Sequence, residues 1–220
     1  MASAFSHAVF ASGLGAAGAP GGRMPVRYWV ALAVIGAAPD LDVVVYPLGL
    51  NAPDILGHRG ITHALPFAAV FAALVVRLLF RGVEWRPVWG RLWLVFFAAM
   101  ASHAILDGLT NGGQGIAFFA PFSDARWHFP WTPIRVSPIG LTAFFSVEGL
   151  RVLQNELVWV WLPSALLMLA ARLVRVRHAG WGTYASYPDA AHGDHSRGLR
   201  ASGPAPAEAD LSEGPNRNRR

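Results

Sequence analysis

The chain has 220 residues, of which 54% are hydrophobic and only 14% are charged. Water-soluble domains carry about 25% charged residues, so this composition argues against a fully soluble protein and favours one whose surface largely meets lipid. Cysteine is absent, which excludes disulfides and thiolate metal ligands.

Five apolar segments follow one another, at residues 6–19, 27–38, 64–80, 92–106 and 157–171. A helix needs about 20 residues to cross the hydrocarbon layer, and about 17 is near the minimum. With flanking residues the last three segments can span, whereas the first two are expected to form a tight, partly embedded pair. No basic residue precedes Arg23, so we expect a retained first helix and no signal peptide. The sequence predicts an all-α, multi-pass membrane protein with four or five hydrophobic helices.

Residues 179–220 differ from the rest of the chain. They are rich in Gly, Ala, Pro, Ser and Asp and show no apolar periodicity. Such a composition cannot bury enough apolar surface to fold, so we predict a disordered, polar, cytoplasmic tail. The remaining residues, 1–178, then form one membrane-embedded domain.

Arginines are concentrated between the third and fourth apolar segments. Arg77, Arg81, Arg86 and Arg91 occur there with one acidic residue, Glu84. Basic residues beside apolar segments indicate the cytoplasmic side, and the same distribution makes nucleic acid an unexpected partner despite the net charge of +5. With this loop inside the cell, four separate stretches deliver histidine or aspartate to the extracytoplasmic face.

His103 and Asp107 stand four residues apart near the end of the fourth segment. This spacing places both side chains on one face of a helix, where they can hold one metal ion. The alternative is a buried polar pair that joins two helices by hydrogen bonding. Ionisable groups are costly in a membrane and usually functional, which favours the metal.

Two further histidines, His58 and His63, enclose a short polar motif. Gly60 permits a sharp bend between them. Thr62 is suited either to cap the helix that follows or to a direct role in the site.

Asp40 and Asp42 follow Pro39, which is expected to end the second apolar helix. The two carboxylates can bind one ion, bridge two ions, or simply cap a surface loop. His7 begins the first segment and joins them if its helix starts on the same side. The predicted ligand set is therefore His7, Asp40, Asp42, His58, His63, His103 and Asp107.

Seven nitrogen and oxygen ligands exceed what one catalytic zinc ion takes, which is normally three. The set suits two or more divalent ions that share a bridging carboxylate. We expect zinc, although manganese and iron are compatible with the same ligands. Paired metals activate water and stabilise charge during phosphoester displacement.

Three motifs carry a family resemblance: Pro-Asp-Leu-Asp at 39–42, Gly-His-Arg-Gly-Ile-Thr-His at 57–63 and Ser-His-Ala-Ile-Leu-Asp-Gly-Leu-Thr at 102–110. In this order and spacing they resemble the YdjM-type proteins of the bacterial inner membrane, described as metal-dependent hydrolases and as LexA-binding. The similarity covers roughly residues 5–171. It implies a helical inner-membrane protein with six of the seven residues above, all but Asp42, as ligands.

The motifs also resemble, more distantly, zinc phospholipase C and related nucleases, which are all-helical and cleave phosphoesters with three metals. Those enzymes use a later His-x-x-x-Glu pair. Glu148 and Glu156 lie in the corresponding region, but neither follows a histidine at that spacing. The sequence leaves open whether either glutamate joins the site.

Two arginines are candidates for binding an anionic substrate. Arg59 can hold a phosphate or carboxylate oxygen with its planar guanidinium, or can pair with Asp40, Asp42 or Asp54. Arg126 lies in the aromatic loop 110–140, which is expected either to sit in the membrane interface and present a lipid, or to form a packed lid.

These features favour a membrane-bound metal-dependent hydrolase that cleaves a phosphoester in a lipid, a small molecule or another envelope-associated substrate. The alternative is a non-enzymatic inner-membrane regulator that recruits a cytoplasmic partner such as a LexA-type repressor. A metal transporter is disfavoured because the ligands gather at one face and not along a midplane path.

Overall fold

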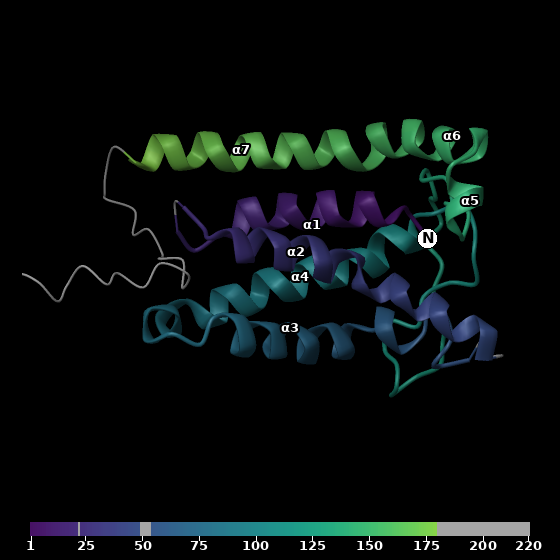
Figure 1. Ribbon diagram of the computed structural model, residues 1–220, viewed down its shortest axis with the longest axis horizontal. Helices are drawn as coiled ribbons and strands as arrows, with labels where there is room; N and C mark the ends of the chain where they lie inside the picture. The colour runs from purple at the N-terminus through teal and green to yellow at the C-terminus, as the bar shows by residue number, and fades with distance from the viewer. Residues whose placement is uncertain (22, 49–53, 180–220) are drawn as a thin grey trace, which may run out of the picture. The chain divides into compact units, whose positions relative to one another are not determined.

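The computed structural model describes residues 1–21, 23–48 and 54–179 (Figure 1). Nearly all of the predicted tail lies outside these residues, so its disorder and the domain boundary stay predictions. Every regular element in the described ranges is a helix, and extended backbone pairs only at two isolated bridges, Thr110 with Ile134 and Ile116 with Trp127. The all-α prediction is confirmed.

The elements, in chain order, are α1 (Ala4–Gly18), α2 (Val26–Ala37), η1 (Ala38–Leu48), η2 (Ile61–His63), α3 (Leu65–Leu79), η3 (Val83–Val88), α4 (Trp89–Gly108), α5 (Leu141–Phe144), α6 (Val147–Glu156), η4 (Leu157–Trp161) and α7 (Leu162–Ala179). The first three η elements are 3-10 helices. The fourth is a π-helical turn, through which α6 runs into α7.

Two helices are long and apolar enough to cross a membrane. They are Val83–Gly108, with 26 residues, and Val147–Arg177, with 31 residues. They contain the predicted segments 92–106 and 157–171, while α3 is apolar but has only 15 residues. Only 11% of the apolar stretch of the second helix is buried in the protein, against 50% for the first. That the chain has four or five spanning helices stays a prediction.

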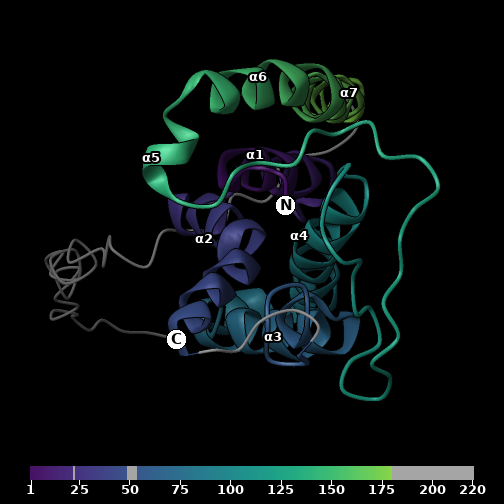
Figure 2. The same ribbon diagram turned by 90° about the vertical axis from the view of Figure 1, so that its right-hand side faces the viewer.

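The long helices run back and forth along one direction (Figure 1). Seen end-on, α7 covers α1, α1 lies over α2 and α4, and α3 packs against α4 on the far side (Figure 2). Because successive helices alternate in direction, the start of α1, the end of α2, the start of α3 and the end of α4 meet at one end. The predicted ligands lie at or beside these four termini.

An aromatic core fills the opposite end, between α1, α2, α3 and α4. Tyr28 packs edge-on against Phe96, with ring centroids 5.7 Å apart, and its hydroxyl donates to the Gly15 carbonyl over 2.8 Å. The guanidinium of Arg27 lies over the rings of Phe80 and Trp85. This packing fixes the helices at the arginine-rich end, away from the polar residues.

Gly36 allows α1 and α2 to approach closely near the other end. A Cβ atom at this position would lie 2.6 Å from the Ala11 Cβ and 2.8 Å from the His7 carbonyl oxygen. Both distances are shorter than ordinary van der Waals contact. The absence of a side chain therefore brings His7 and the backbone of Gly36 together beside α4.

Candidate metal centre

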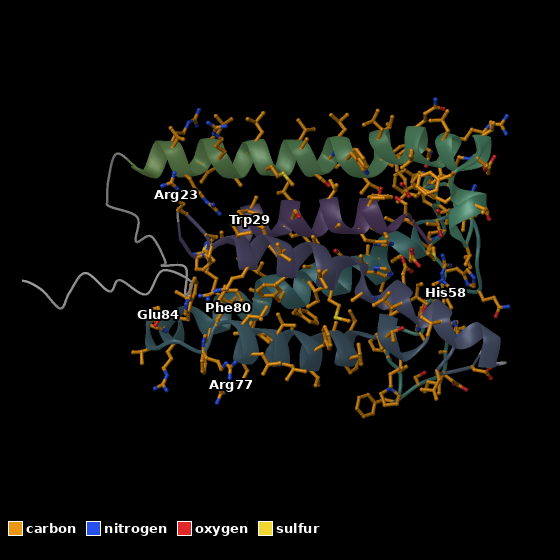
Figure 3. The ribbon with its side chains drawn as sticks, viewed as in Figure 1. Arg23, Trp29, His58, Arg77, Phe80 and Glu84 are labelled. Carbon is orange, nitrogen blue, oxygen red and sulfur yellow. The ribbon has the colours of Figure 1, made fainter. Side chains whose placement is uncertain are left out.

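All seven predicted ligands are buried at the same end of the helices, and they are His7 on α1, Asp40 and Asp42 on η1, His58 before η2, His63 on η2, and His103 and Asp107 on α4. His58 lies at the end opposite Arg23, Arg77 and Glu84 (Figure 3). The predicted separation of the arginine-rich loop 77–91 from the ligands is thus present in the fold. Which face of the membrane each end meets stays a prediction.

The ligand atoms form two groups that share His63. One group is Asp40, His63, His103 and Asp107, and the other is Asp42, His58 and His63; within each group the atoms lie within 4.8 Å of one another. His7 adjoins the first group, with its Nε2 3.3 Å from Asp107 Oδ1 and 3.8 Å from Asp40 Oδ2.

Hydrogen bonds orient two of the imidazoles toward a common point. His103 Nδ1 lies 2.7 Å from the Gly36 carbonyl oxygen, and His63 Nδ1 lies 3.3 Å from Asp42 Oδ2. Each Nδ1–H thus has an acceptor, as is usual for metal-binding histidines. The two Nε2 atoms then lie only 3.1 Å apart. Two lone pairs this close repel each other unless a proton or a metal cation lies between them.

Five buried polar atoms at this point have no hydrogen-bond partner within the described part of the chain. They are both ring nitrogens of His7, both carboxylate oxygens of Asp40, and Oδ2 of Asp107. More than 90% of buried polar groups in proteins are satisfied, and each exception costs about 1–3 kcal/mol or more. These atoms lie close together and two carboxylates are among them, so a bound cation would reduce the free-energy cost of burying them.

Asp40 and Asp107 each direct their two oxygens to different histidines. Asp40 Oδ1 lies 3.3 Å from His103 Nε2, while its Oδ2 faces His7. Asp107 Oδ1 faces His7, whereas its Oδ2 lies 3.7 Å from His63 Nε2. Each carboxylate therefore faces two imidazoles and could contribute to a metal site.

Asp42 accepts hydrogen bonds from several neighbours. Its Oδ1 lies 2.7 Å from His58 Nδ1, and Thr62 Oγ1 donates to its Oδ2 over 2.7 Å. The capping role predicted for Thr62 is wrong: α3 begins at Leu65, its N-cap is Ala64, and no side chain caps it. Thr62 instead orients Asp42, which in turn orients His63.

Burial would raise the pKa of Asp42, but hydrogen bonds from His58 and His63 outweigh it and hold that pKa well below its usual range. His63 shows the opposite shift. Burial lowers its pKa, yet the carboxylates of Asp107 and Asp42 raise it to about 9. A cation that binds His63 must therefore displace a proton.

Arg59 is buried and pairs with a partner that the sequence did not indicate. Its Nε lies 3.3 Å from Asp107 Oδ2, and its two terminal nitrogens donate to Thr110 Oγ1 and the Gly112 carbonyl over 2.9 and 2.8 Å. Its backbone has φ +64°, in the left-handed region. Non-glycine residues are uncommon in this region, and those that occur there cluster at functional sites. These contacts make Arg59 a positioning residue for Asp107, and a direct substrate contact stays a prediction.

Gly60 has the role expected of it, although its φ is −89°. A Cβ there would collide with the Ile55 carbonyl and lie 2.8 Å from the Gly57 carbonyl. The tight turn puts His58 and His63 on either side of Asp42, which explains the spacing of the motif.

Arg126 holds the backbone of this turn. Its terminal nitrogens donate to the carbonyls of Asp54, over 3.1 Å, and of Arg59, over 3.3 Å. Burial and the nearby positive charge of Arg59 lower the pKa of Arg126. Its guanidinium thus lies beside the candidate centre, and its predicted contact with a phosphate stays a prediction.

Neither glutamate belongs to the candidate ligand groups of the described residues. Glu148 is exposed and pairs with Arg135 and Arg151 over 2.9 and 3.3 Å. Glu156 is fully buried and accepts hydrogen bonds from the backbone N–H and hydroxyl of Ser3 and from the hydroxyl of Ser6. It thereby fixes the first turn of α1, one turn before His7. The sequence signal for this role of Glu156 was its position as an ionisable residue directly before the apolar segment 157–171.

Comparison with known proteins identifies the family. The family model described as YdjM inner membrane protein matches residues 1–179. The chain belongs to the YdjM inner membrane protein family. It is also 39% identical over 146 residues to the inner membrane protein YbcI of Escherichia coli (strain K12), an alignment that covers 66% of this chain and 83% of YbcI. No solved structure matches.

The predicted family and inner-membrane location are thus confirmed, since the family and the relative are both named inner membrane proteins. The match extends beyond the predicted 5–171 at both ends and includes every candidate ligand. Neither name mentions hydrolysis or a metal.

Proposed function

We propose that this YdjM family member is a membrane-bound metal-dependent phosphoesterase acting on a lipid or another envelope-associated substrate. The observation that carries the proposal is the group of five buried nitrogen and oxygen atoms on His7, Asp40 and Asp107 that make no hydrogen bond within the described residues. Four of them have only ion-pair contacts of 3.3–4.0 Å, among them Asp107 Oδ2 with Arg59 and Asp40 Oδ1 with His103. A donor set that still lacks hydrogen bonds in this way fits divalent cations.

The residues would divide the binding as follows. His63 and His103 would hold one ion through Nε2, His7 would bind a second, and Asp40 and Asp107 would contribute to both. The donors favour zinc and are compatible with manganese or iron. A divalent metal bound there would lower the pKa of water and neutralise the charge of a phosphoester.

The chain's own residues supply positioning and charge. Arg59 and Arg126 add two buried or partly buried positive charges on the side of the centre formed by the turn 54–60. Positive charge at this place supports an anionic substrate over a neutral amide or ester. Because the ligands gather at the end opposite the arginine-rich loop, we expect the reaction on the extracytoplasmic side.

The test is to purify the full chain in detergent, measure its bound metals, and assay phosphodiesters and phosphomonoesters. The parent should contain at least one equivalent of metal, and His103→Ala should lose both metal and activity. Ser123→Ala, in the exposed loop, is the control and should lose neither. Phosphoester hydrolysis by metal-free parent, or metal content that does not change in His103→Ala, would reject the proposal.

The regulator hypothesis makes the opposite prediction for the same variants. A protein whose function is to recruit a cytoplasmic partner, such as a LexA-type repressor, would retain that function after His103→Ala. It would lose the function on neutralisation of the arginines between α3 and α4.

A further inference from the structure

The uncharged part of α4 is shorter than the hydrocarbon layer of a membrane. No arginine, lysine or acidic residue occurs between Arg91 and Asp107. These two residues are separated by roughly 24 Å along the helix axis, at 1.5 Å per residue. The hydrocarbon layer is about 30 Å thick, so with Arg91 at one edge of this layer Asp107 lies about 6 Å inside the other. A tilt of the helix would place Asp107 deeper.

The long apolar helix Val147–Arg177 shows the same spacing. Glu156 and Arg172 are also separated by roughly 24 Å along the axis, with no charged residue between them. Glu156 is fully buried and accepts hydrogen bonds from Ser3 and Ser6, so it lies level with the first turn of α1. Two helices from distant parts of the sequence therefore place a buried carboxylate at the same depth.

The protein surface around the ligands is apolar on three different elements. Ile105 lies two residues from each ligand of α4 and is 45% exposed. Leu41 separates the two aspartates of η1 and is 68% exposed, and Phe5 lies two residues before His7 and is 58% exposed. Each ligand thus points inward while a neighbour at the same level points outward. A helix that faced water at this level would carry polar side chains on its outer side.

The outer surface becomes polar just beyond the level of the ligands. Arg151 and Gln154 of α6 are exposed, and they precede the buried Glu156. Between Glu156 and Arg172, in contrast, every exposed position carries a hydrophobic residue or proline. On this helix the change from polar to apolar surface therefore falls beside Glu156, on the side away from the arginines.

The loop that follows α4 has the composition of a membrane interface. Its side chains of Phe122, Trp127 and Trp131 are 84%, 53% and 59% exposed, and the polar Asp124 lies among them. Tryptophan is enriched where the hydrocarbon layer meets the headgroups. Because this loop begins after the last ligand of α4, its aromatic residues indicate an interface beyond the ligands and not among them.

We propose that the ligand cluster lies inside the hydrocarbon layer, about one helical turn from its edge, and that acyl chains of this leaflet contact Phe5, Leu41 and Ile105 around it. Ionisable side chains at such a depth belong in the interior of the protein, and all seven ligands are buried there. The inference goes beyond the proposed function, because it concerns the depth of the centre whatever reaction takes place in it.

The experiment measures depth with nitroxide spin labels on the full chain in nanodiscs of phosphatidylethanolamine and phosphatidylglycerol. The chain has no cysteine, so one introduced cysteine carries the only label. Leu41→Cys and Ile105→Cys report the level of the ligands. Gln154→Cys is the control on the polar side, and Leu166→Cys, exposed within the long apolar helix, is the control in hydrocarbon. Size-exclusion chromatography and circular dichroism verify that each variant is folded.

Power-saturation EPR compares the collisions of each label with oxygen, which concentrates in hydrocarbon, and with a neutral nickel chelate, which stays in water. Hydrocarbon excludes polar solutes, so the ratio of oxygen to nickel collisions should be about tenfold higher for Leu41→Cys and Ile105→Cys than for Gln154→Cys. The ratio for Leu166→Cys should be at least as high as for the two test positions.

A ratio for Leu41→Cys and Ile105→Cys equal to that for Gln154→Cys would overturn the inference and place the centre in the headgroup or aqueous layer. The two test positions lie on different elements, and Phe5→Cys on α1 replaces either of them if it does not fold. Neither metal content nor hydrolysis enters the measurement. A failure of the phosphoesterase proposal is therefore distinguishable from a failure of the predicted depth.

Discussion

The sharpest test of the packing beside the centre is Gly36→Ala. The added Cβ would lie 2.6 Å from the Ala11 Cβ and 2.8 Å from the His7 carbonyl oxygen. Carbon atoms normally pack about 3.5–4.0 Å apart, so α1 and α2 must separate by about 1 Å. Neither neighbour can rotate away, because one is a backbone atom and the other is the first atom of its side chain.

The expected magnitude follows from two opposing effects. Overpacking a buried contact costs about 1–3 kcal/mol, whereas replacing glycine by alanine within a helix gains about 1 kcal/mol. We therefore expect Gly36→Ala to lose up to about 2 kcal/mol of stability, or up to roughly 8 °C in Tm. Gly90→Ala is the control: its Cβ would have no neighbour within 4 Å, so it should be neutral or slightly stabilising.

Gly36→Ala should also weaken metal binding. The clash falls on the backbone of His7, and the carbonyl that accepts from His103 Nδ1 belongs to the substituted residue. Loss of such a supporting hydrogen bond lowers metal affinity about 10–100-fold. Thermal unfolding in detergent and competition with a chelator measure both effects. If Gly36→Ala matches Gly90→Ala in Tm and in metal affinity, the close approach of α1 and α2 does not determine the site.

Glu156→Gln should lower stability by about 1–2 kcal/mol and weaken metal binding, since hydrogen bonds to a charged acceptor contribute about 1.5–3 kcal/mol. Glu148→Gln, on an exposed ion pair, is the control and should change neither quantity. Identical unfolding curves for Glu156→Gln and Glu148→Gln would contradict the prediction. Because the folded metal-free protein raises the pKa of His63 to about 9, the stability from its ion pairs is present below about pH 6.5 and lost as the pH rises through about 9. Metal affinity should rise between about pH 6.5 and 9, and metal titrations at pH 6, 7.5 and 9 measure it. An affinity that falls as the pH rises would exclude proton displacement. Reporter tags inserted after Arg81 and after Phe122 should lie in opposite compartments, the second outside; a shared compartment would exclude the predicted topology.

The gathering of the ligands was predictable from the sequence because it depends on helix direction alone. If successive helices alternate in direction, His7 at the start of the first helix and His103 near the end of the fourth must lie at the same end, whatever the exact packing of the helices. Pro39 likewise marked the end of α2, although the chain continues as a 3-10 helix and does not enter a loop. This helical turn is what directs Asp40 toward His103 and Asp42 toward His63.

Other features depend on contacts that no periodicity encodes. The predicted last segment began at 157, whereas the helix begins at Val147, because α6 is amphipathic and its polar face conceals it in a search for apolar runs. The partner of Arg59 was mispredicted for a similar reason. Its side chain pairs with Asp107, which is 48 residues away in the sequence, and its backbone there is left-handed.

The position of α1 explains how the long apolar helix Val147–Arg177 and the ligand cluster can depend on each other. On one face α1 carries His7 into the cluster, and on another it packs against η4 and α7. Glu156 accepts hydrogen bonds from Ser3 and Ser6, so the first turn that orients His7 is held by this long helix. A displacement of the long helix must move the first turn of α1 or break buried hydrogen bonds to a carboxylate. Since breaking them costs more than a small rigid shift, His7 should follow the helix Val147–Arg177.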